Sequence, residues 1–287
     1  MEALILDSIP LALVAATPLL LAVEGELVAQ RSGLINLGIE GVILFAALAA
    51  AAATQMSGSI GVGFAAGIAA ALAANALFAL FAIVFDADQI VTGTALNLLA
   101  LGTTGVLYGE MQRTGAASAI LPRAGTDLVA PLAWTLIPLL LFILLWRTTF
   151  GLRLRACGEH PDAVRAAGSS VGLHRAAALG IEAILAGLAG AHLALVLSSG
   201  FAENMTAGRG FIALAIVIFG RWNVPGALAG TALFGFAAAA QFALQAANRG
   251  IPYHLLLAVP YVVTLLFLVF AAGRVRSPAA LGQREIG

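Results

Sequence analysis

Long apolar runs, bounded by glycine, proline or charged residues, repeat along nearly the whole chain. A helix needs about 20 apolar residues to cross a bilayer. The runs predict nine candidate spans: 8–28, 34–55, 59–84, 88–108, 130–147, 175–199, 204–220, 226–247 and 252–273. The seventh run is short and begins near glycines, which favours a broken or re-entrant helix. The pattern predicts an all-α, polytopic bundle of eight or nine membrane helices, in a single domain over residues 1–287.

Composition narrows the class of protein. Charged residues make up 10% of the chain and hydrophobic residues 61%, whereas soluble domains carry about 25% charged residues. The chain has no lysine, which excludes a Walker A nucleotide site and a lysine Schiff base. A net charge of zero without a basic run argues against nucleic-acid binding. A single cysteine excludes an intrachain disulfide, and four scattered histidines give no metal-binding spacing.

One polar insert, residues 148–174, interrupts the apolar pattern. A charged side chain at the bilayer centre costs about 2.5–3.5 kcal/mol in insertion experiments. The insert and its flank carry too many charges to lie in lipid, namely Arg153, Arg155, Glu159, Asp162, Arg165 and Arg175. We therefore expect a loop outside the membrane.

The arginines predict the orientation, because basic residues collect on the cytoplasmic side. If the insert is cytoplasmic and all nine segments cross, ten arginines lie inside. The four that lie outside are then Arg113, Arg123, Arg209 and Arg249. This arrangement places the N-terminus outside, and it places the polar C-terminal tail, residues 274–287, in the cytoplasm.

The insert also encodes a short helix with marked ends. Pro161 suits a first helical turn, where its missing N–H is not needed, and Gly168 suits a C-terminal cap. Two helical turns are too short to be stable alone. The small side chains of Ala163, Ala166 and Ala167 therefore predict docking into a groove on another protein.

Three stretches resemble a known family. "FGLRLRACGEHPDAVRAAGSSVGLHRAAALGIEAILAGLAGAHLAL" resembles the coupling loop of ABC importer permeases of the branched-chain amino acid and simple-sugar superfamily. "QRSGLINLGIEGVILFAA" and "NMTAGRGFIALAIVIFGRWNVPGALAG" are similar to signatures of its nucleoside-type permeases. In the family, the loop helix inserts into a cytoplasmic ATPase. The resemblance assigns ATPase coupling to Gly151, Arg153, Gly158, Glu159, Pro161, Ala163, Ala166 and Gly168.

The resemblance implies a function and partners. The chain is expected to be a permease subunit with a type II ABC importer-like fold in a bacterial inner membrane. It is expected to translocate a small polar solute, in the first place a nucleoside. Its expected partners are a cytoplasmic ABC ATPase, a second permease that is identical or homologous, and an extracellular substrate-binding lipoprotein. ATP would be bound by the ATPase, so this chain needs no cofactor and has no catalytic residues of its own.

Polar residues inside the predicted spans are candidates for the substrate path, because such groups are costly in lipid. Asn36 and Glu40 lie four apart and are expected to share one helix face. Thr94 and Asn97 are expected to point in one direction as well. The full set of candidates is Asn36, Glu40, Thr94, Asn97, Arg209 and Gln241.

For each of these side chains the alternative is a structural role. Glu40 is then expected to bind Asn36, Arg31 or a neighbouring backbone, and Arg209 to anchor the broken start of the seventh span. Glu182 is expected to be structural and to pair with Arg175 or Arg221.

Two other functional classes stay open. An ion-coupled secondary transporter needs a coupling carboxylate deep in the bundle, and Glu40 is the candidate. An intramembrane serine protease would use Ser198 or Ser199 with His254, but "LSSGFA" lacks the Gly-x-Ser core of such enzymes.

Overall fold

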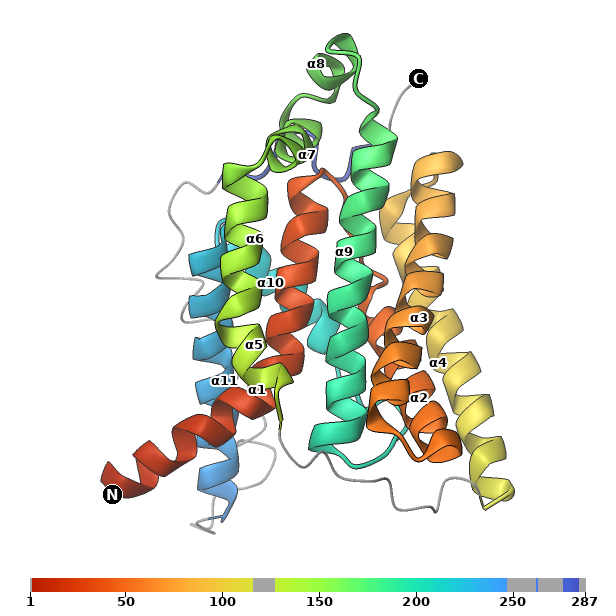
Figure 1. Ribbon diagram of the computed structural model, residues 1–287, viewed down its shortest axis with the longest axis vertical. Helices are drawn as coiled ribbons and strands as arrows, with labels where there is room; N and C mark the ends of the chain where they lie inside the picture. Colours follow the sequence, from red (N-terminus) through yellow and green to blue (C-terminus); the bar gives the residue numbers. More distant parts are fainter. Residues whose placement is uncertain (1, 116–126, 247–261, 263–275, 284–287) are drawn as a thin grey trace.

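The computed structural model describes residues 2–115, 127–246, 262 and 276–283, with side chains from 12 to 238 inside these ranges and in the C-terminal segment. This part of the chain is helical and contains no strand. Figure 1 shows a bundle with α7, α8 and the C-terminal segment 276–283 at one end, and the start of α1 at the other. The elements are α1 (Glu2–Arg31), α2 (Ile39–Ser57), α3 (Ile60–Ala79), α4 (Gln89–Arg113), α5 (Val129–Trp134), α6 (Leu136–Arg147), α7 (Thr149–Glu159), α8 (Pro161–Ala166), α9 (Val171–His192), α10 (Arg209–Phe219), α11 (Val224–Ala246) and the π-helical turns η1 (Leu80–Val84) and η3 (Leu193–Leu197).

Six helical segments are long and apolar enough to cross a membrane, so the chain is a multi-pass membrane protein. They match the first six predicted spans and are Ala12–Arg31, Ile39–Ser57, Ile60–Val84, Gln89–Arg113, Val129–Arg147 and Val171–Leu197. The seventh predicted span contains α10, whose 11 residues extend only about 16 Å, and α11 corresponds to the eighth. The ninth predicted span, 252–273, lies outside the described residues except for Val262.

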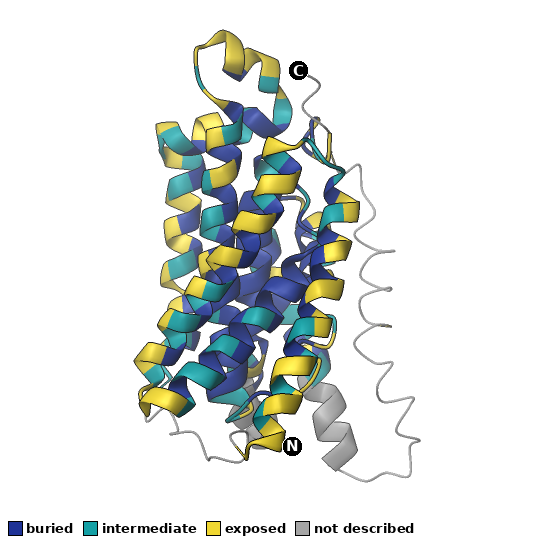
Figure 2. Cartoon of the chain, turned by 90° about the vertical axis from the view of Figure 1, so that its right-hand side faces the viewer, coloured by how far each residue is buried: buried dark blue, intermediate teal, exposed yellow. Residues whose placement is uncertain are grey.

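The spans divide into a central and a peripheral set. The most apolar 18-residue stretches of α1, α2 and α9 are at least 67% buried inside the protein, whereas those of α3, α4 and α5–α6 are at most 33% buried. Figure 2 shows buried residues in the interior and exposed residues on the outward faces. The exposed residues of the peripheral helices are largely leucine, valine and phenylalanine, as expected of surfaces that face lipid.

Small residues bring neighbouring helices into close contact, as at Gly67 of α3 and Gly230 of α11. A Cβ on Gly67 would lie 3.1 Å from the Ala46 carbonyl oxygen, and a Cβ on Gly230 would lie 2.9 Å from the Ile216 side chain. Such contacts permit close backbone packing where lipid supplies no hydrophobic drive between helices.

Two helices begin inside the bundle instead of at its ends. Gly210, at the start of α10, packs so closely on Glu40, near the start of α2, that an added Cβ would meet the Glu40 backbone nitrogen at 2.6 Å. From this contact α2 runs away from the α8 end, and α10 runs towards it (Figure 1). The non-helical connections 32–38 and 198–208 lead to the two helix starts.

The connection between α1 and α2 is buried, and side chains from other elements bind its backbone. The Ile35 N–H donates to the Gln89 side chain (2.8 Å), and the Leu37 carbonyl accepts from the Asn97 side chain (2.8 Å). Arg175 of α9 donates to the Ser32 carbonyl (3.2 Å). Within the connection itself, the Gly38 N–H donates to the Asn36 side chain (3.0 Å). Irregular backbone is tolerated at membrane depth where protein groups replace water in this way.

Replacing Gly190 by alanine is expected to destabilise the bundle. A Cβ there would overlap the Ile43 carbonyl oxygen and lie 2.7 Å from the Ala46 Cβ, which forces α2 and α9 apart. Overpacking of this kind costs about 1–3 kcal/mol. A lower melting temperature of the purified protein in detergent is the expected result.

Gly180→Ala on the same helix is the matched control, because nothing lies within 4 Å of the added Cβ. Equal melting temperatures for the two variants would contradict the close packing of α2 on α9.

Candidate functional site

The short helix that the polar insert predicts is present at one end of the bundle as α8. Pro161 occupies its first turn, as expected. The helix ends in a Schellman motif: Gly168 has a φ of +73°, its N–H donates to the Arg165 carbonyl (2.9 Å), and the Ser169 N–H donates to the Val164 carbonyl (3.1 Å). Glycine suits the left-handed backbone of that position. The sequence therefore predicted both ends of this short helix correctly.

One face of α8 is free in this chain and the other is packed. Ala163, Ala166 and Ala167 are exposed. Val164 is buried and packs with Cys157 and Val171, which fixes α8 between the end of α7 and the start of α9. The helix that carries these exposed alanines projects furthest from the bundle (Figure 1).

The other predicted coupling residues separate into two groups. Arg153 is exposed, and the Glu159 and Pro161 side chains are half-buried. Gly151 and Gly158 are buried. A Cβ on Gly151 would overlap the Leu144 carbonyl oxygen, and one on Gly158 would overlap the Arg31 carbonyl oxygen. These two glycines allow α7 to pack closely on the bundle.

The Glu40 carboxylate holds the start of α10. Its Oε1 accepts the N–H of Gly208 (2.7 Å), and its Oε2 accepts the N–H of Gly210 (2.6 Å). The first N–H groups of a helix lack intrahelical partners and carry partial positive charge. Gly208 has a φ of +82°. Of the structural roles considered for Glu40, the structure supports binding to a neighbouring backbone.

Arg209 folds back over the same helix start. Its guanidinium donates to the carbonyls of Met205 (3.0 Å) and Thr206 (3.1 Å), which stabilises the end of the 198–208 connection. The side chain is half-buried. These contacts agree with the expectation that Arg209 anchors the seventh segment.

Asn36 does not share a helix face with Glu40, because α2 begins only at Ile39. Its amide instead donates to Asn75 (2.9 Å) and to both carboxyl oxygens of Glu182 (3.1 and 3.2 Å). Asn75 also donates to Glu182 (3.2 Å). The expected pairing of Glu182 with Arg175 or Arg221 is wrong, because the buried amides of Asn36 and Asn75 donate hydrogen bonds to its carboxyl group instead.

The network continues into α1. Glu26 lies beside Glu182, and both carboxyl groups are buried. Gln30 donates to Glu26 (2.8 Å) and accepts from the indole N–H of Trp222 (2.6 Å). Two neighbouring buried carboxyl groups therefore extend the network from α9 to α1.

Sequence reasoning missed Glu26 and Asn75 in this network. Both lie within apolar runs, and the rule that identified Glu40 applies equally to them.

The Thr94 and Asn97 side chains do not point in one direction. Thr94 is exposed on the outer face of α4. Asn97 is buried, where it accepts from Gly41 N–H (2.8 Å) and donates to the Leu37 carbonyl. Gln241 belongs to α11, but its side chain lies outside the described residues, as does His254 of the hypothetical protease.

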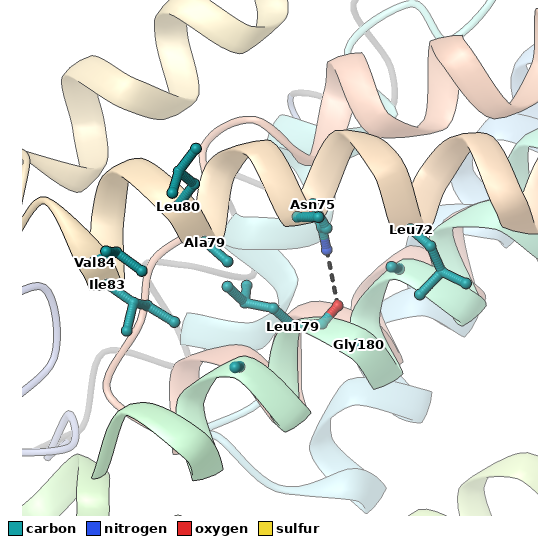
Figure 3. Close-up of a pocket in the computed structure, with 11 residues that line it drawn as sticks. Leu72, Asn75, Ala79, Leu80, Ile83, Val84, Leu179 and Gly180 are labelled. Carbon is teal, nitrogen blue, oxygen red and sulfur yellow. Dashed lines mark hydrogen bonds between the residues drawn. The ribbon is translucent and has the colours of Figure 1, made fainter. Parts of the chain in front are cut away.

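A groove of about 380 Å³ lies between α3, η1 and α9. Figure 3 shows Asn75 at this groove, turned towards the Leu179 carbonyl, to which it donates (3.0 Å). The other lining residues are apolar. A polar solute would therefore find few hydrogen-bond partners in this groove.

The comparisons with known proteins agree on a family. The family model described as the branched-chain amino acid transport system / permease component matches residues 9–272. A guanosine ABC transporter permease of Bacillus subtilis is 34% identical over 96% of this chain and 94% of its own length. No solved structure matches the chain.

Two further relatives have similar coverage. A putative glucose ABC transporter permease of Haloferax volcanii is 33% identical, over 94% of both chains. A nucleoside ABC transporter permease of Lactococcus lactis is 32% identical, over 96% of this chain and 95% of its own length.

Replacing Glu40 by glutamine is expected to loosen the start of α10. The glutamine oxygen can still accept one of the two backbone N–H groups, of Gly208 or Gly210, but its NH₂ group cannot accept the second. One charge-assisted hydrogen bond is therefore lost. Such a bond contributes about 1.5–3 kcal/mol. The measurement is the melting temperature in detergent, which should fall.

Glu203→Gln makes the same chemical change at an exposed position of the 198–208 connection, and should leave the melting temperature unchanged. An unchanged melting temperature for Glu40→Gln would show that Glu40 does not anchor α10.

Proposed function

This chain belongs to the family of branched-chain amino acid transport system permease components, and we propose that it is the membrane subunit of an ABC importer for nucleosides. The observation that carries the substrate class is the pair of relatives named for guanosine and for nucleosides, matched over 94% and 95% of their lengths. The relative named for glucose makes a sugar the competing substrate. A cytoplasmic ATPase, a second permease and an extracellular binding lipoprotein complete the proposed complex.

The proposed coupling helix is α8. Its exposed alanine face supports docking, because a helix of six residues has little stability of its own and gains it by packing. Val164 ties α8 to α7 and α9. A displacement of the docked helix would therefore act on both of these elements.

The α8 end is proposed to face the cytoplasm. Of the ten arginines that the structure describes, Arg113 and Arg209 lie away from this end. The other eight support a cytoplasmic location by the positive-inside rule, and they are Arg31, Arg147, Arg153, Arg155, Arg165, Arg175, Arg221 and Arg276.

Nine crossings with a cytoplasmic C-terminus fit the described helices best. The 198–208 connection and α10 together return the chain to the α8 end, and α11 leaves it again (Figure 1). Residues 278–282 lie at the α8 end, where Ala280 N–H donates to the Gly158 carbonyl (2.8 Å). One more crossing is then needed between Ala246 and Arg276, which supports the proposed span 252–273.

The contacts reduce the number of residues that we propose for the substrate path. Asn36, Glu40 and Asn97 are buried and have hydrogen-bonding partners within the protein. Arg209 is half-buried and Thr94 is exposed. The exposed face of α4 that carries Thr94 is apolar, and the Thr94 hydroxyl donates to the Ile90 carbonyl (2.8 Å). We therefore favour Arg209 as a residue that faces a solute, with Gln241 kept from the sequence.

A movement of α8 would be transmitted to the substrate path through contacts between backbone segments. Gly158, at the end of α7, packs directly on the Arg31 carbonyl and the Gly33 N–H. The 32–38 connection then leads to Glu40 and the start of α10. In this mechanism ATP binding closes the ATPase pair and moves α8, and the movement shifts the α2–α10 contact in the bundle centre to alternate access.

The alternative, an ion-coupled transporter, gains one observation from the structure. Glu40 is poorly suited to carry an ion, because both of its oxygens bind α10. The neighbouring buried carboxyl groups of Glu26 and Glu182 are the better candidates for coupling to a proton gradient.

Transport by the reconstituted complex separates the two hypotheses. In proteoliposomes that contain the ATPase and the binding protein, uptake of radiolabelled guanosine is expected to require ATP and to persist with an uncoupler. Excess unlabelled glucose should not compete, whereas other nucleosides should. Uptake by this chain alone that an uncoupler abolishes would refute the proposal and favour ion coupling.

Replacing Ala166 by arginine is expected to abolish ATP-driven uptake. The long charged side chain would stand on the docking face and weaken binding of the ATPase by about tenfold or more, as for a central interface position. The affinity of the binding protein should not change. Co-purification of the ATPase and titration of the binding protein measure the two effects.

Ser57→Arg provides the control, since Ser57 is exposed at the opposite end of the bundle. An intact, active complex with Ala166→Arg would show that α8 is not the docking helix.

A further inference from the structure

The C-terminal segment Pro278–Gln283, called the C-terminal strap, bridges two parts of the chain that are distant in sequence. Its Ala280 N–H donates to the Gly158 carbonyl (2.8 Å), and its Gly282 N–H donates to the Gly33 carbonyl (2.9 Å). The Ala279 N–H donates to the Glu159 carboxylate (3.3 Å). The strap is thus bonded to the end of α7 and to the α1–α2 connection.

The strap has a defined turn and buried anchors. Pro278 and Ala280 are buried, and Leu281 packs against the main apolar core. Gly282 has a φ of +71°, and a Cβ there would lie 3.2 Å from the Ile35 side chain. A segment held by backbone hydrogen bonds and buried side chains presents its remaining groups in fixed positions.

A groove of about 420 Å³ lies between the strap and the start of α8. The Glu159–Ala163 segment forms one wall, and Ala279, Ala280 and Gln283 form the other. Ala279 and Gln283 are exposed, and they stand beside the proposed ATPase-docking face.

The groove is lined by the carboxylates of Glu159 and Asp162 and by His160, whereas the two arginines near these carboxylates are not part of its lining. The Glu159 side chain is 45% exposed and lies 4.0 Å from Arg31, and the Asp162 side chain is 93% exposed. One Asp162 oxygen accepts from Arg165 (2.7 Å). Two accessible carboxylates in one groove favour a cationic side chain as the occupant.

We propose that the C-terminal strap is a second element of the ATPase interface, and that the groove between the strap and α8 receives a basic side chain of the ATPase subunit. This inference rests on the proposed function, which supplies the partner that docks on α8. It adds a docking wall from a part of the chain more than 100 residues away. The strap then couples the ATPase both to α7, at Gly158, and to the α1–α2 connection, at Gly33.

The test measures the affinity of the ATPase subunit for the full-length permease in nanodiscs. Ala279→Arg places bulk and positive charge in the groove, and should weaken binding about tenfold or more. Ser277→Arg, at an exposed residue next to the strap but outside the groove, should bind within about twofold of wild type. Unchanged melting temperatures establish that both variants fold.

A third variant tests the charge of the occupant. Ala279→Glu adds a comparable side chain but keeps the groove negative, so it should bind more tightly than Ala279→Arg. The difference should shrink at high salt, because salt screens exposed charges. Equal weakening by glutamate and arginine at low salt would overturn the assignment of a basic occupant.

The outcomes separate the inference from the proposed function. If Ala166→Arg weakens binding and Ala279→Arg does not, the strap is not part of the interface and the inference fails while the proposed function stands. Equal weakening by Ser277→Arg and Ala279→Arg overturns it too, because the groove then has no special role. If neither Ala166→Arg nor Ala279→Arg has an effect, docking at α8 fails and the inference fails with it.

Discussion

The arrangement of helices in the interior of this membrane protein depends on the Glu40 carboxylate. It accepts hydrogen bonds from N–H groups at the start of α10 that have no partner within that helix. No water is available at membrane depth to satisfy a helix that begins there, so a protein group must do so. Because Glu40 also lies in the first turn of α2, one side chain joins the starts of two helices that run to opposite ends. Helix starts of this kind near the middle of a bundle are typical of transporter binding regions.

A second set of contacts joins this centre to the end that carries α8. Gly158 packs on the Arg31 carbonyl and the Gly33 N–H, where any side chain would collide. The α1–α2 connection runs from that point to the start of α2, and Gln89 and Asn97 bind its backbone. Packed and hydrogen-bonded backbone therefore connects α7 and α8 to the start of α2. A transport subunit that receives its energy from a separate ATPase needs such a rigid path.

The buried amides and carboxyl groups give the central helices a second, polar mode of contact. Asn36, Asn75 and Glu182 link α1–α2, α3 and α9, and Glu26 extends the network into α1. Apolar packing alone discriminates poorly between helix arrangements in lipid. In a network of this kind, by contrast, all hydrogen bonds can form together only in a few arrangements of the helices. The neighbouring buried carboxyl groups of Glu26 and Glu182 also make this network the most informative place to look for ion coupling.

The sequence alone determined the membrane class, the first six spans, the short seventh helix and both ends of α8, because these follow from local hydrophobic runs and from the backbone preferences of proline and glycine. It also identified Glu40 and Arg209 as unusual. Only the tertiary structure decided what these residues bind, since hydrogen-bond partners come from elements distant in sequence. The sequence spacing placed Asn36 on the face of Glu40, but the interruption before α2 turns Asn36 towards Glu182. The position of the strap against Gly158 likewise depends on how the helices pack.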